Sequence, residues 1–354
     1  MHILRLILFP ISILYGIITY CRNKLYDWKI FKSTSFQTPV ISIGNLEVGG
    51  SGKTPMVEYL IKLLAKDYHL ATLSRGYGRQ TTGFRWVKPD DLAKDTGDEP
   101  LQIKRKFENI GVAVSENRVF GITEIQKEYT LILMDDAYQH RAVKPGLSIL
   151  LFDYQSFQKQ TVMLPTGNYR EYFSGKSRAD VMIVSKCPSN ILDKEKGEII
   201  EQLEPKLTQK VFFSSIKYQQ NLKSVFDDNT ISIDEINKDT AVILLTGIAK
   251  PQSLVNQLKQ STNHITHHQY SDHHIFTPKN MLKLANDFES LQLAQKIIIT
   301  TEKDAVRLNT IEFKNILAKL PIFYWPIQVE FTQQNKINFE KLITEYAQSN
   351  KRIS

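Results

Sequence analysis

Short apolar runs alternate with amphipathic stretches along most of the chain, and this pattern predicts an α/β fold with a largely parallel sheet. The first series of predicted strands covers residues 40–43, 70–74, 111–114, 130–134, 147–152, 180–185 and 211–214. Amphipathic stretches at residues 55–66, 117–125 and 191–203 fit helices between these strands. A second series has strands at 241–245 and 296–300, helices at 251–259 and 279–290, and an extended run at 321–331.

A polar stretch at residues 218–240 separates the two series and indicates a connection between domains. The length of 354 residues agrees with two domains. The sequence therefore predicts an N-terminal segment at residues 1–32, a phosphate-loop domain at 33–217, the connection at 218–240, and a smaller α/β domain at 241–354.

The N-terminal segment is strongly apolar, because residues 3–21 carry a single charged side chain, Arg5. As a helix this stretch would be ~28 Å long, close to the ~30 Å of a bilayer's hydrocarbon core. Arg5 and Pro10 argue against a spanning helix, and the basic residues that follow suit an anionic membrane surface. We expect a monotopic helix in the membrane interface, with a spanning helix and a buried core helix as alternatives. The absence of a small-residue cleavage site argues against a signal peptide.

Composition narrows the class of protein further. The chain is 42% hydrophobic and 23% charged, which excludes disordered and low-complexity proteins. Cys21 and Cys187 are too few for a disulfide framework or a cysteine-rich zinc site. The net charge is +8, and residues 1–32 contribute +4 of it from five basic residues and one acidic residue. No aromatic–basic interleaving accompanies this charge, so nucleic acid is not a predicted partner.

A glycine-rich turn lies between a predicted strand and a predicted helix, where residues 40–54 read VISIGNLEVGGSGKT. Glycines allow backbone N–H groups to curl around phosphate oxygens, Lys53 supplies a positive charge, and the Thr54 hydroxyl can reach a magnesium ion. Glu47 departs from the usual pattern, which has glycine there. The predicted ATP-binding residues are Glu47, Val48, Gly49, Gly50, Ser51, Gly52, Lys53 and Thr54.

A second predicted strand ends in two carboxylates, Asp135 and Asp136. A parallel strand beside the phosphate loop would place them where Mg²⁺ binds, and the sequence leaves open which of them contacts the metal directly. Val48 in place of a signature lysine argues against a membrane-cycling ATPase, and no Asn-Lys-x-Asp string marks a GTPase.

Further polar strings occur at predicted strand ends and turns: SRGYGR at 74–79, GDEP at 97–100, DDAYQHR at 135–141, LPTGNYRE at 164–171, SDHH at 271–274 and TTEKDAVR at 300–307. With the glycine-rich turn and the apolar N-terminus, these strings closely resemble the tetraacyldisaccharide 4'-kinase family of lipid A biosynthesis, as far as about Leu308. The resemblance implies two α/β domains around a cleft, at the cytoplasmic face of the bacterial inner membrane. It also implies transfer of the γ-phosphoryl group of ATP, with Mg²⁺, to the 4'-hydroxyl of a lipid A disaccharide 1-phosphate.

Roles for individual residues follow from this reaction. Asp98 is the predicted general base, because a carboxylate can accept the proton of the attacking hydroxyl, and His273 would orient or tune it. His274 is the competing partner of Asp98. By resemblance, the active-site rim and lining include Arg75, Tyr77, Gln139, His140, Arg170 and Glu171. No obligate protein partner is predicted. The alternative function is a membrane-tethered ATPase switch that recruits a partner and phosphorylates nothing.

Overall fold

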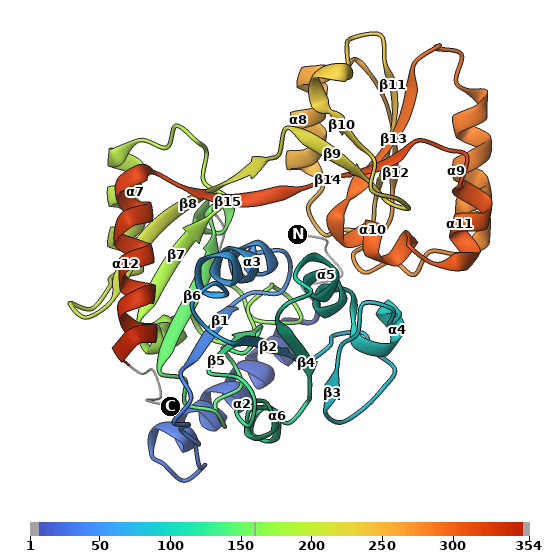
Figure 1. The fold of residues 1–354 in the computed structure, drawn as a ribbon. Coiled ribbons are helices and arrows are strands. Elements are labelled where there is room, and N and C mark those ends of the chain that lie inside the picture. Colours follow the sequence, from blue (N-terminus) through green and yellow to red (C-terminus); the bar gives the residue numbers. More distant parts are fainter. Residues whose placement is uncertain (1–6, 159–160, 350–354) are drawn as a thin grey trace.

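The computed structural model describes residues 7–158 and 161–349, whose strands form two sheets (Figure 1). The large sheet contains nine strands in the order β15 (Ile327–Phe331), β8 (Lys210–Tyr218), β7 (Val181–Ser185), β6 (Leu147–Asp153), β1 (Val40–Asn45), β5 (Leu131–Asp135), β2 (Leu70–Ser74), β4 (Gly111–Val114) and β3 (Arg85–Trp86). Strands β8 to β4 are parallel, and the edge strands β15 and β3 are antiparallel. The predicted α/β class with a mainly parallel sheet is confirmed.

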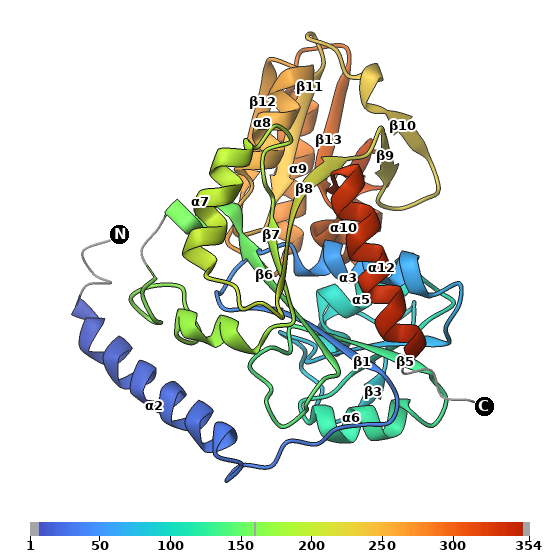
Figure 2. The same cartoon turned by 90° about the vertical axis from the view of Figure 1, so that its left-hand side faces the viewer.

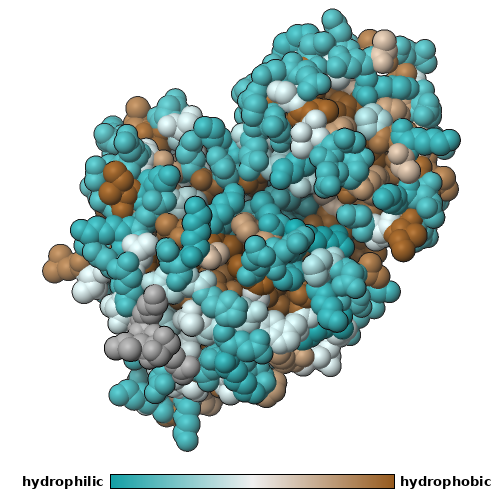
Figure 3. All heavy atoms as spheres, in the orientation of Figure 1, coloured by the Kyte–Doolittle hydropathy of each residue, from teal (hydrophilic) through white to brown (hydrophobic). Residues whose placement is uncertain are grey.

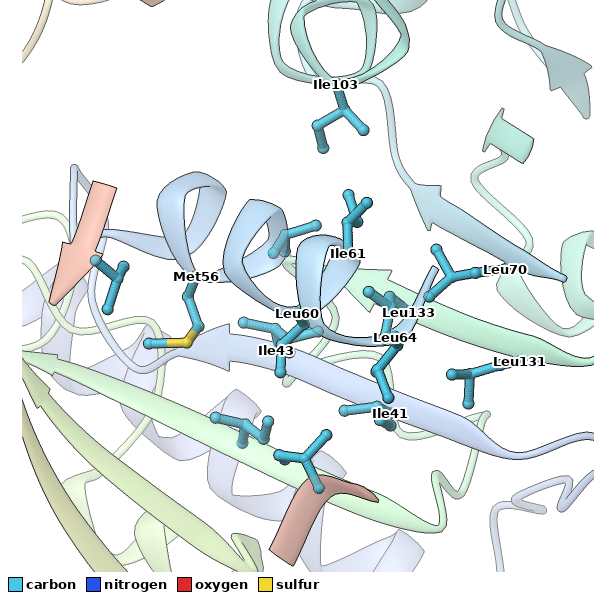
Figure 4. Close-up of a cluster of buried hydrophobic side chains, with 14 of the residues drawn as sticks. Ile41, Ile43, Met56, Leu60, Ile61, Leu64, Leu70, Ile103, Leu131 and Leu133 are labelled. Atoms are coloured by element: carbon cyan, nitrogen blue, oxygen red, sulfur yellow. The ribbon is translucent and has the colours of Figure 1, made fainter. Parts of the chain in front are cut away.

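Helices cover the large sheet and supply much of its core. They are α3 (Lys53–Leu64), α4 (Ala93–Thr96), α5 (Asp98–Lys106), α6 (Arg118–Ile125), α7 (Asp193–Leu203) and α12 (Gln333–Ser349). Helix α3 buries Met56, Leu60, Ile61 and Leu64, which lie three to four residues apart and therefore share one helix face. Figure 4 shows this face packed on the apolar side chains of β1, β5 and β2. The glycine-rich turn is thus held between a buried strand and a buried helix.

The second sheet has six strands in the order β10 (Thr230–Ser232), β9 (Asn221–Ser224), β14 (Ile322–Trp325), β13 (Lys296–Thr301), β11 (Ala241–Thr246) and β12 (His264–Gln269). Its helices are α8 (Gln252–Ser261), α9 (Pro278–Ser290), α10 (Glu302–Leu308) and α11 (Ile311–Leu317). Separate apolar clusters fill its interior, including Leu284 and Phe288. We call this sheet with α8 to α11 the second unit, and the rest of the described chain the first unit.

Two predicted domain boundaries are wrong. The polar stretch 218–240 contains β9 and β10, which belong to the second sheet. Its composition is polar because these short strands, at and next to one edge of the sheet, leave several side chains exposed. The predicted second domain, 241–354, loses its C-terminal part, because β15 pairs with β8 and α12 packs on the first unit (Figure 1). The extended run 321–331 therefore divides at Pro326 between the two sheets.

Helix α2 (Phe9–Asp27) lies along the outside of the first unit (Figure 2). Its inner side is fixed by hydrogen bonds, such as those of Ser12 with Thr166 at 2.8 Å and of Tyr15 with the Arg170 carbonyl at 3.0 Å. Its outer side exposes apolar side chains, each 50% exposed or more: Ile7 just before the helix, Phe9, Ile11, Ile13, Leu14, Ile17, Ile18 and Tyr20. Residues 3–6 of the predicted apolar run lie outside the described residues. Across residues 7–158 and 161–349, no helix has the length and apolar character required to cross a membrane.

The place of α12 predicts a stability effect. Phe339 is fully buried, and its ring lies 4.9 Å from that of Phe331 and 5.3 Å from that of Phe212. We expect Phe339→Ala to lower the free energy of unfolding by about 3–5 kcal/mol, since it leaves a cavity in the first unit's core. Ile337→Ala, at a half-exposed position of the same helix, is the control and should change it by less than about 0.5 kcal/mol. If chemical denaturation showed that Phe339→Ala and Ile337→Ala change the free energy of unfolding equally, this result would contradict the packing of α12 on the first unit.

Candidate active site

The glycine-rich turn between β1 and α3 has the backbone of an anion-binding loop. Gly49 and Gly52 have φ of 101° and 82°, a region that L side chains rarely adopt. Lys53 is the first residue of α3, and its Nζ lies 3.3 Å from Asn45 Oδ1 and 3.6 Å from Asp136 Oδ1. Backbone N–H groups at a helix N-terminus attract anions, so the turn and Lys53 together form a site suited to phosphate.

The two carboxylates at the end of β5 lie beside this turn, because β5 pairs with β1 in parallel. Asp136 forms an ion pair with Arg170 at 2.8 Å. Burial alone would raise the pKa of Asp136, but the charges of Lys53 and Arg170 outweigh it and lower this pKa. In contrast, burial and the nearby charges of Glu99 and Asp136 raise the pKa of Asp135 to about 7.

Asp135 also provides a test of whether a metal ion fits this position. Its Oδ1 is buried and has no hydrogen-bond partner. An orphaned carboxylate oxygen beside a phosphate loop is a ligand that Mg²⁺ would satisfy. Among the described residues, no group of three or more His, Cys, Asp and Glu side chains could hold a metal ion. Mg²⁺ commonly uses one or two carboxylates and completes its shell with water and substrate phosphate.

A cavity of about 390 Å³ extends from the phosphate loop to the second unit. Residues 48–54 line it from the first unit, together with Tyr77, Glu99, Asp136 and Arg170. The second unit contributes, among others, Ile248, Lys250, Asp272, His273 and Lys303. The space-filling view shows a notch between the two units on a mainly hydrophilic face (Figure 3). The site is therefore built from both units.

Asp98 and His273 come from different units and meet at this cavity. His273 Nδ1 lies 3.2 Å from Asp98 Oδ2, and the ring of Tyr77 contacts His273 with its centroid 4.9 Å away. Asp98 is buried behind His273. Burial alone would raise the pKa of Asp98, but the hydrogen bond to His273 and the charges of Lys303 and Arg307 hold it below its usual value. Asp98 is therefore an ionised carboxylate at neutral pH.

The competing partner, His274, does not reach Asp98. Its Nε2 lies 3.2 Å from Asn280 Oδ1, and its ring stacks on Tyr270 at 4.4 Å. The structure thus pairs His273 with Asp98 and places His274 in the second unit's own packing. Gly97 begins the helix that presents Asp98; its φ is 92°, and a Cβ there would lie 3.0 Å from the Tyr77 carbonyl.

The remaining predicted residues lie on the α2 side of the site. Glu171 is buried and accepts hydrogen bonds from Arg178 at 2.7 Å, Gln139 at 3.0 Å and Asn23 at 3.0 Å. Gln139 also donates to the Asn45 carbonyl at 2.8 Å, so this network reaches the strand that precedes the phosphate loop. These contacts connect the loop, the rim and α2.

His140 lies among basic side chains, which include Arg75. His140 Nε2 is buried without a hydrogen-bond partner, and burial followed by the charges of Arg118, Arg22 and Arg75 lowers its pKa to about 4. Arg75 itself is exposed. Glu47, a predicted ATP-binding residue, does not line the cavity, and its carboxylate accepts a hydrogen bond from Ser156 at 2.9 Å.

Comparison with known proteins identifies the family to which the chain belongs. A family model described as tetraacyldisaccharide-1-P 4'-kinase matches residues 4–347. A tetraacyldisaccharide 4'-kinase of Phocaeicola vulgatus is 42% identical over 98% of this chain and 96% of its own length. One from Flavobacterium johnsoniae is 42% identical over 99% of both chains. The chain belongs to the tetraacyldisaccharide-1-P 4'-kinase family. The resemblance inferred from the sequence motifs is thereby confirmed.

A solved member of this kinase family has the same fold. The crystal structure described as the apo form of LpxK from Aquifex aeolicus in complex with ATP superposes with a TM-score of 0.73 at 28% sequence identity. The match covers 97% of this chain and 99% of that one.

Several charged residues of this kinase site were not assigned from the sequence. Lys186 follows β7 at the edge of the sheet where the phosphate loop lies; it has a φ of 59° and its ammonium group donates to the Gly50 carbonyl. Lys250, from the second unit, bonds Asp153 at 2.8 Å. A signal was available for Lys186, because side chains that follow parallel strands gather at one edge of the sheet. No such sequence signal was available for Lys250, because its contact with Asp153 depends on how the two units meet.

Proposed function

We propose that the protein transfers the γ-phosphoryl group of ATP to the 4'-hydroxyl of a tetraacyldisaccharide 1-phosphate, which gives the 1,4'-bisphosphate. The observation that carries the proposal is the placement of a phosphate loop and the Asp98–His273 pair around one cavity in a chain of this kinase family. A phosphoryl transfer to an alcohol needs both parts, whereas an ATPase switch that phosphorylates nothing leaves this pair without a function.

On the donor side, Lys53 and the backbone N–H groups of residues 49–54 would hold the β- and γ-phosphates. Thr54 and Asp135, with Asp136 beside them, are the residues that would hold Mg²⁺. When bound, this ion would neutralise charge that develops on the transferred group. Arg170 fixes Asp136 through their ion pair and keeps this carboxylate directed toward Lys53. The part of the cavity lined by Ile248 and Lys250 provides room for the rest of the nucleotide.

On the acceptor side, the attacking hydroxyl must lose a proton as it bonds to phosphorus. The sequence predicts Asp98 as the acceptor of this proton. Both Asp98 oxygens are occupied, Oδ1 by the Glu99 N–H at 3.0 Å and Oδ2 by His273 and Arg307, and its lowered pKa makes it a weak base. We infer that His273 Nε2, which lies 3.0 Å from Lys303 Nζ beside the cavity, receives the proton and that Asp98 orients the ring and stabilises the imidazolium that forms.

The acceptor is a lipid, and the N-terminal side of the protein suits it. A second cavity, of about 560 Å³, lies beside α2 and is lined mainly by apolar and aromatic side chains, among them Ile17, Tyr20, Met163 and Phe173. We propose that acyl chains occupy this region and that the exposed apolar side of α2 rests in the membrane interface. The basic residues of the segment would face the anionic cytoplasmic leaflet of the inner membrane, where ATP is available.

Product analysis tests the proposed reaction. Purified protein, ATP, Mg²⁺ and detergent-dispersed tetraacyldisaccharide 1-phosphate should give a bisphosphate by mass spectrometry, with the new phosphate placed at the 4' position by ³¹P NMR. Lys53→Ala should lower turnover by roughly 10³- to 10⁵-fold, since a cation on the transferring group is lost. Lys62→Ala, at an exposed position of the same helix, is the matched control and should retain turnover. ATP hydrolysis by the wild-type protein without a phosphorylated lipid would refute the kinase function and support a switch.

Vesicle sedimentation tests the membrane proposal without disturbing the inner contacts of α2. The double substitution Ile11→Glu/Ile18→Glu places two charges on its outer side and should reduce binding to phosphatidylglycerol-containing vesicles by roughly tenfold or more. Leu207→Glu/Ile311→Glu adds the same charge at exposed apolar positions elsewhere and is the control. Both variants should bind ATP normally. Equal sedimentation of the two double variants would show that α2 is not the membrane-binding element.

A further inference from the structure

Arg307 is buried at the junction of the two units and joins the Asp98–His273 pair to the second unit. Its Nε donates to Asp98 Oδ2 at 3.0 Å, and its Nη2 also contacts this carboxylate. Nη2 lies 3.3 Å from His273 Nδ1 as well. The proposed phosphoryl transfer does not assign Arg307 a part, and its side chain does not line the cavity. Its contacts are directed at the pair rather than at a bound molecule.

The guanidinium group is held on its other side by a fully buried carboxylate. Arg307 Nη1 donates to Asp304 Oδ1 at 2.8 Å and to the Gly247 carbonyl at 2.9 Å. Asp304 is itself fixed, because its Oδ2 accepts hydrogen bonds from the Gly247 N–H at 2.9 Å and the Thr301 hydroxyl at 2.7 Å. A planar guanidinium with both edges bound has little freedom to turn, so Arg307 presents a fixed edge to Asp98.

The same turn that anchors Arg307 also fixes the backbone of His273. The Gly247 carbonyl accepts a hydrogen bond from the His273 N–H at 3.1 Å, and His273 has a φ of 56°, which is uncommon for a residue with a side chain. Gly247 has no room for a side chain larger than hydrogen without displacement, since a Cβ there would lie 3.0 Å from Asp304 Oδ1. One small structure, formed by Gly247, Asp304 and Arg307, therefore contacts both members of the pair.

We propose that Arg307 is a positioning residue that sets the orientation and the charge of the Asp98–His273 pair. The proposal rests on the phosphoryl transfer proposed above. Arg307 holds the carboxylate ionised and turned toward His273, so that Nδ1–H donates to Asp98 and Nε2, which lies 3.0 Å from Lys303 Nζ, stays unprotonated. Because Asp98 belongs to the first unit and Arg307 to the second, this arrangement exists only while the two units are docked.

The pH dependence of catalysis distinguishes this role from simple packing. The charged and titratable groups around Asp98 are His273, Lys303 and Arg307 from the second unit and Glu99 from its own helix, with Asp272 and Asp304 farther behind. Arg307 lowers the pKa of Asp98, so removing its charge raises this pKa. Asp98 then becomes protonated at a higher pH, and the acidic limb of the kcat profile should move toward neutral pH.

The test compares Arg307→Met and Arg307→Lys, with Arg105→Met as the matched control. Arg105 also joins α5 to α10, through a contact with the Val306 carbonyl, but does not contact the pair. We expect Arg307→Met to lower kcat by roughly 10- to 100-fold and to leave the KM for ATP within about twofold, because a misplaced pair slows the chemical step. The acidic limb of the kcat–pH profile of Arg307→Met should move to higher pH by about one unit or more.

Arg307→Lys keeps the positive charge but loses the planar guanidinium group that makes paired hydrogen bonds. The acidic limb of its kcat profile should therefore lie at the wild-type pH, while its kcat stays reduced. Arg105→Met should have the wild-type kcat and an acidic limb at the wild-type pH. An unmoved limb in a folded Arg307→Met protein, or a change that appears only in the KM for ATP, would overturn the proposal. If circular dichroism shows that Arg307→Met does not fold, a wild-type kcat in Arg307→Lys overturns it instead. Absence of product from the wild-type protein would refute the proposed function, not this inference alone.

Discussion

The buried carboxylate of Asp98 is the constraint on which the rest of this site depends. A carboxylate removed from water is costly unless opposite charges and hydrogen bonds replace its hydration. Asp98 accepts one hydrogen bond from its own helix, from the Glu99 N–H, and the side chains that contact it, those of His273, Lys303 and Arg307, lie across the junction of the two units. The carboxylate that contacts His273 is therefore also a charge that favours docking of the second unit on the first. The geometry of the Asp98–His273 pair and the docking of the two units therefore depend on the same charges.

The path of the chain serves the same arrangement. It passes from the first unit to the second after β8 and returns before β15, and the two crossings are hydrogen-bonded to each other between Gln219 and Pro326 at 2.9 Å. Helices α5 and α10 meet along the cleft, where Lys106 bonds Glu302 at 2.7 Å and Lys303 bonds Glu99 at 3.1 Å. The phosphate loop lies on one side of this junction and His273 on the other, so ATP bound at the loop would lie beside the Asp98–His273 pair.

The sequence was sufficient for most strands of the first sheet and insufficient for the long-range contacts. Strands β2 and β4 match their predicted bounds, because parallel strands buried on both faces read as continuous apolar runs bounded by polar residues. The phosphate loop was predictable because its glycines and Lys53 are consecutive. The return of β15 to the first sheet was not predictable, because the sequence of an extended apolar segment does not indicate which sheet it joins. Likewise, the TTEKDAVR string marked Arg307 as notable, but its contact with Asp98, which is 209 positions away along the chain, appears only in the fold.

A double-mutant cycle on Asp98 and His273 tests the central claim, that the pair acts as one unit assembled from both parts of the chain. Initial rates of lipid phosphorylation and the affinity for ATP should be measured for Asp98→Asn, His273→Ala and the double variant. Each single change should lower turnover by roughly 10²- to 10⁴-fold with ATP affinity nearly unchanged. We expect the double variant to lose little more than the worse single variant. A double variant whose loss equals the product of the two single losses would show that the residues act independently and would contradict this account.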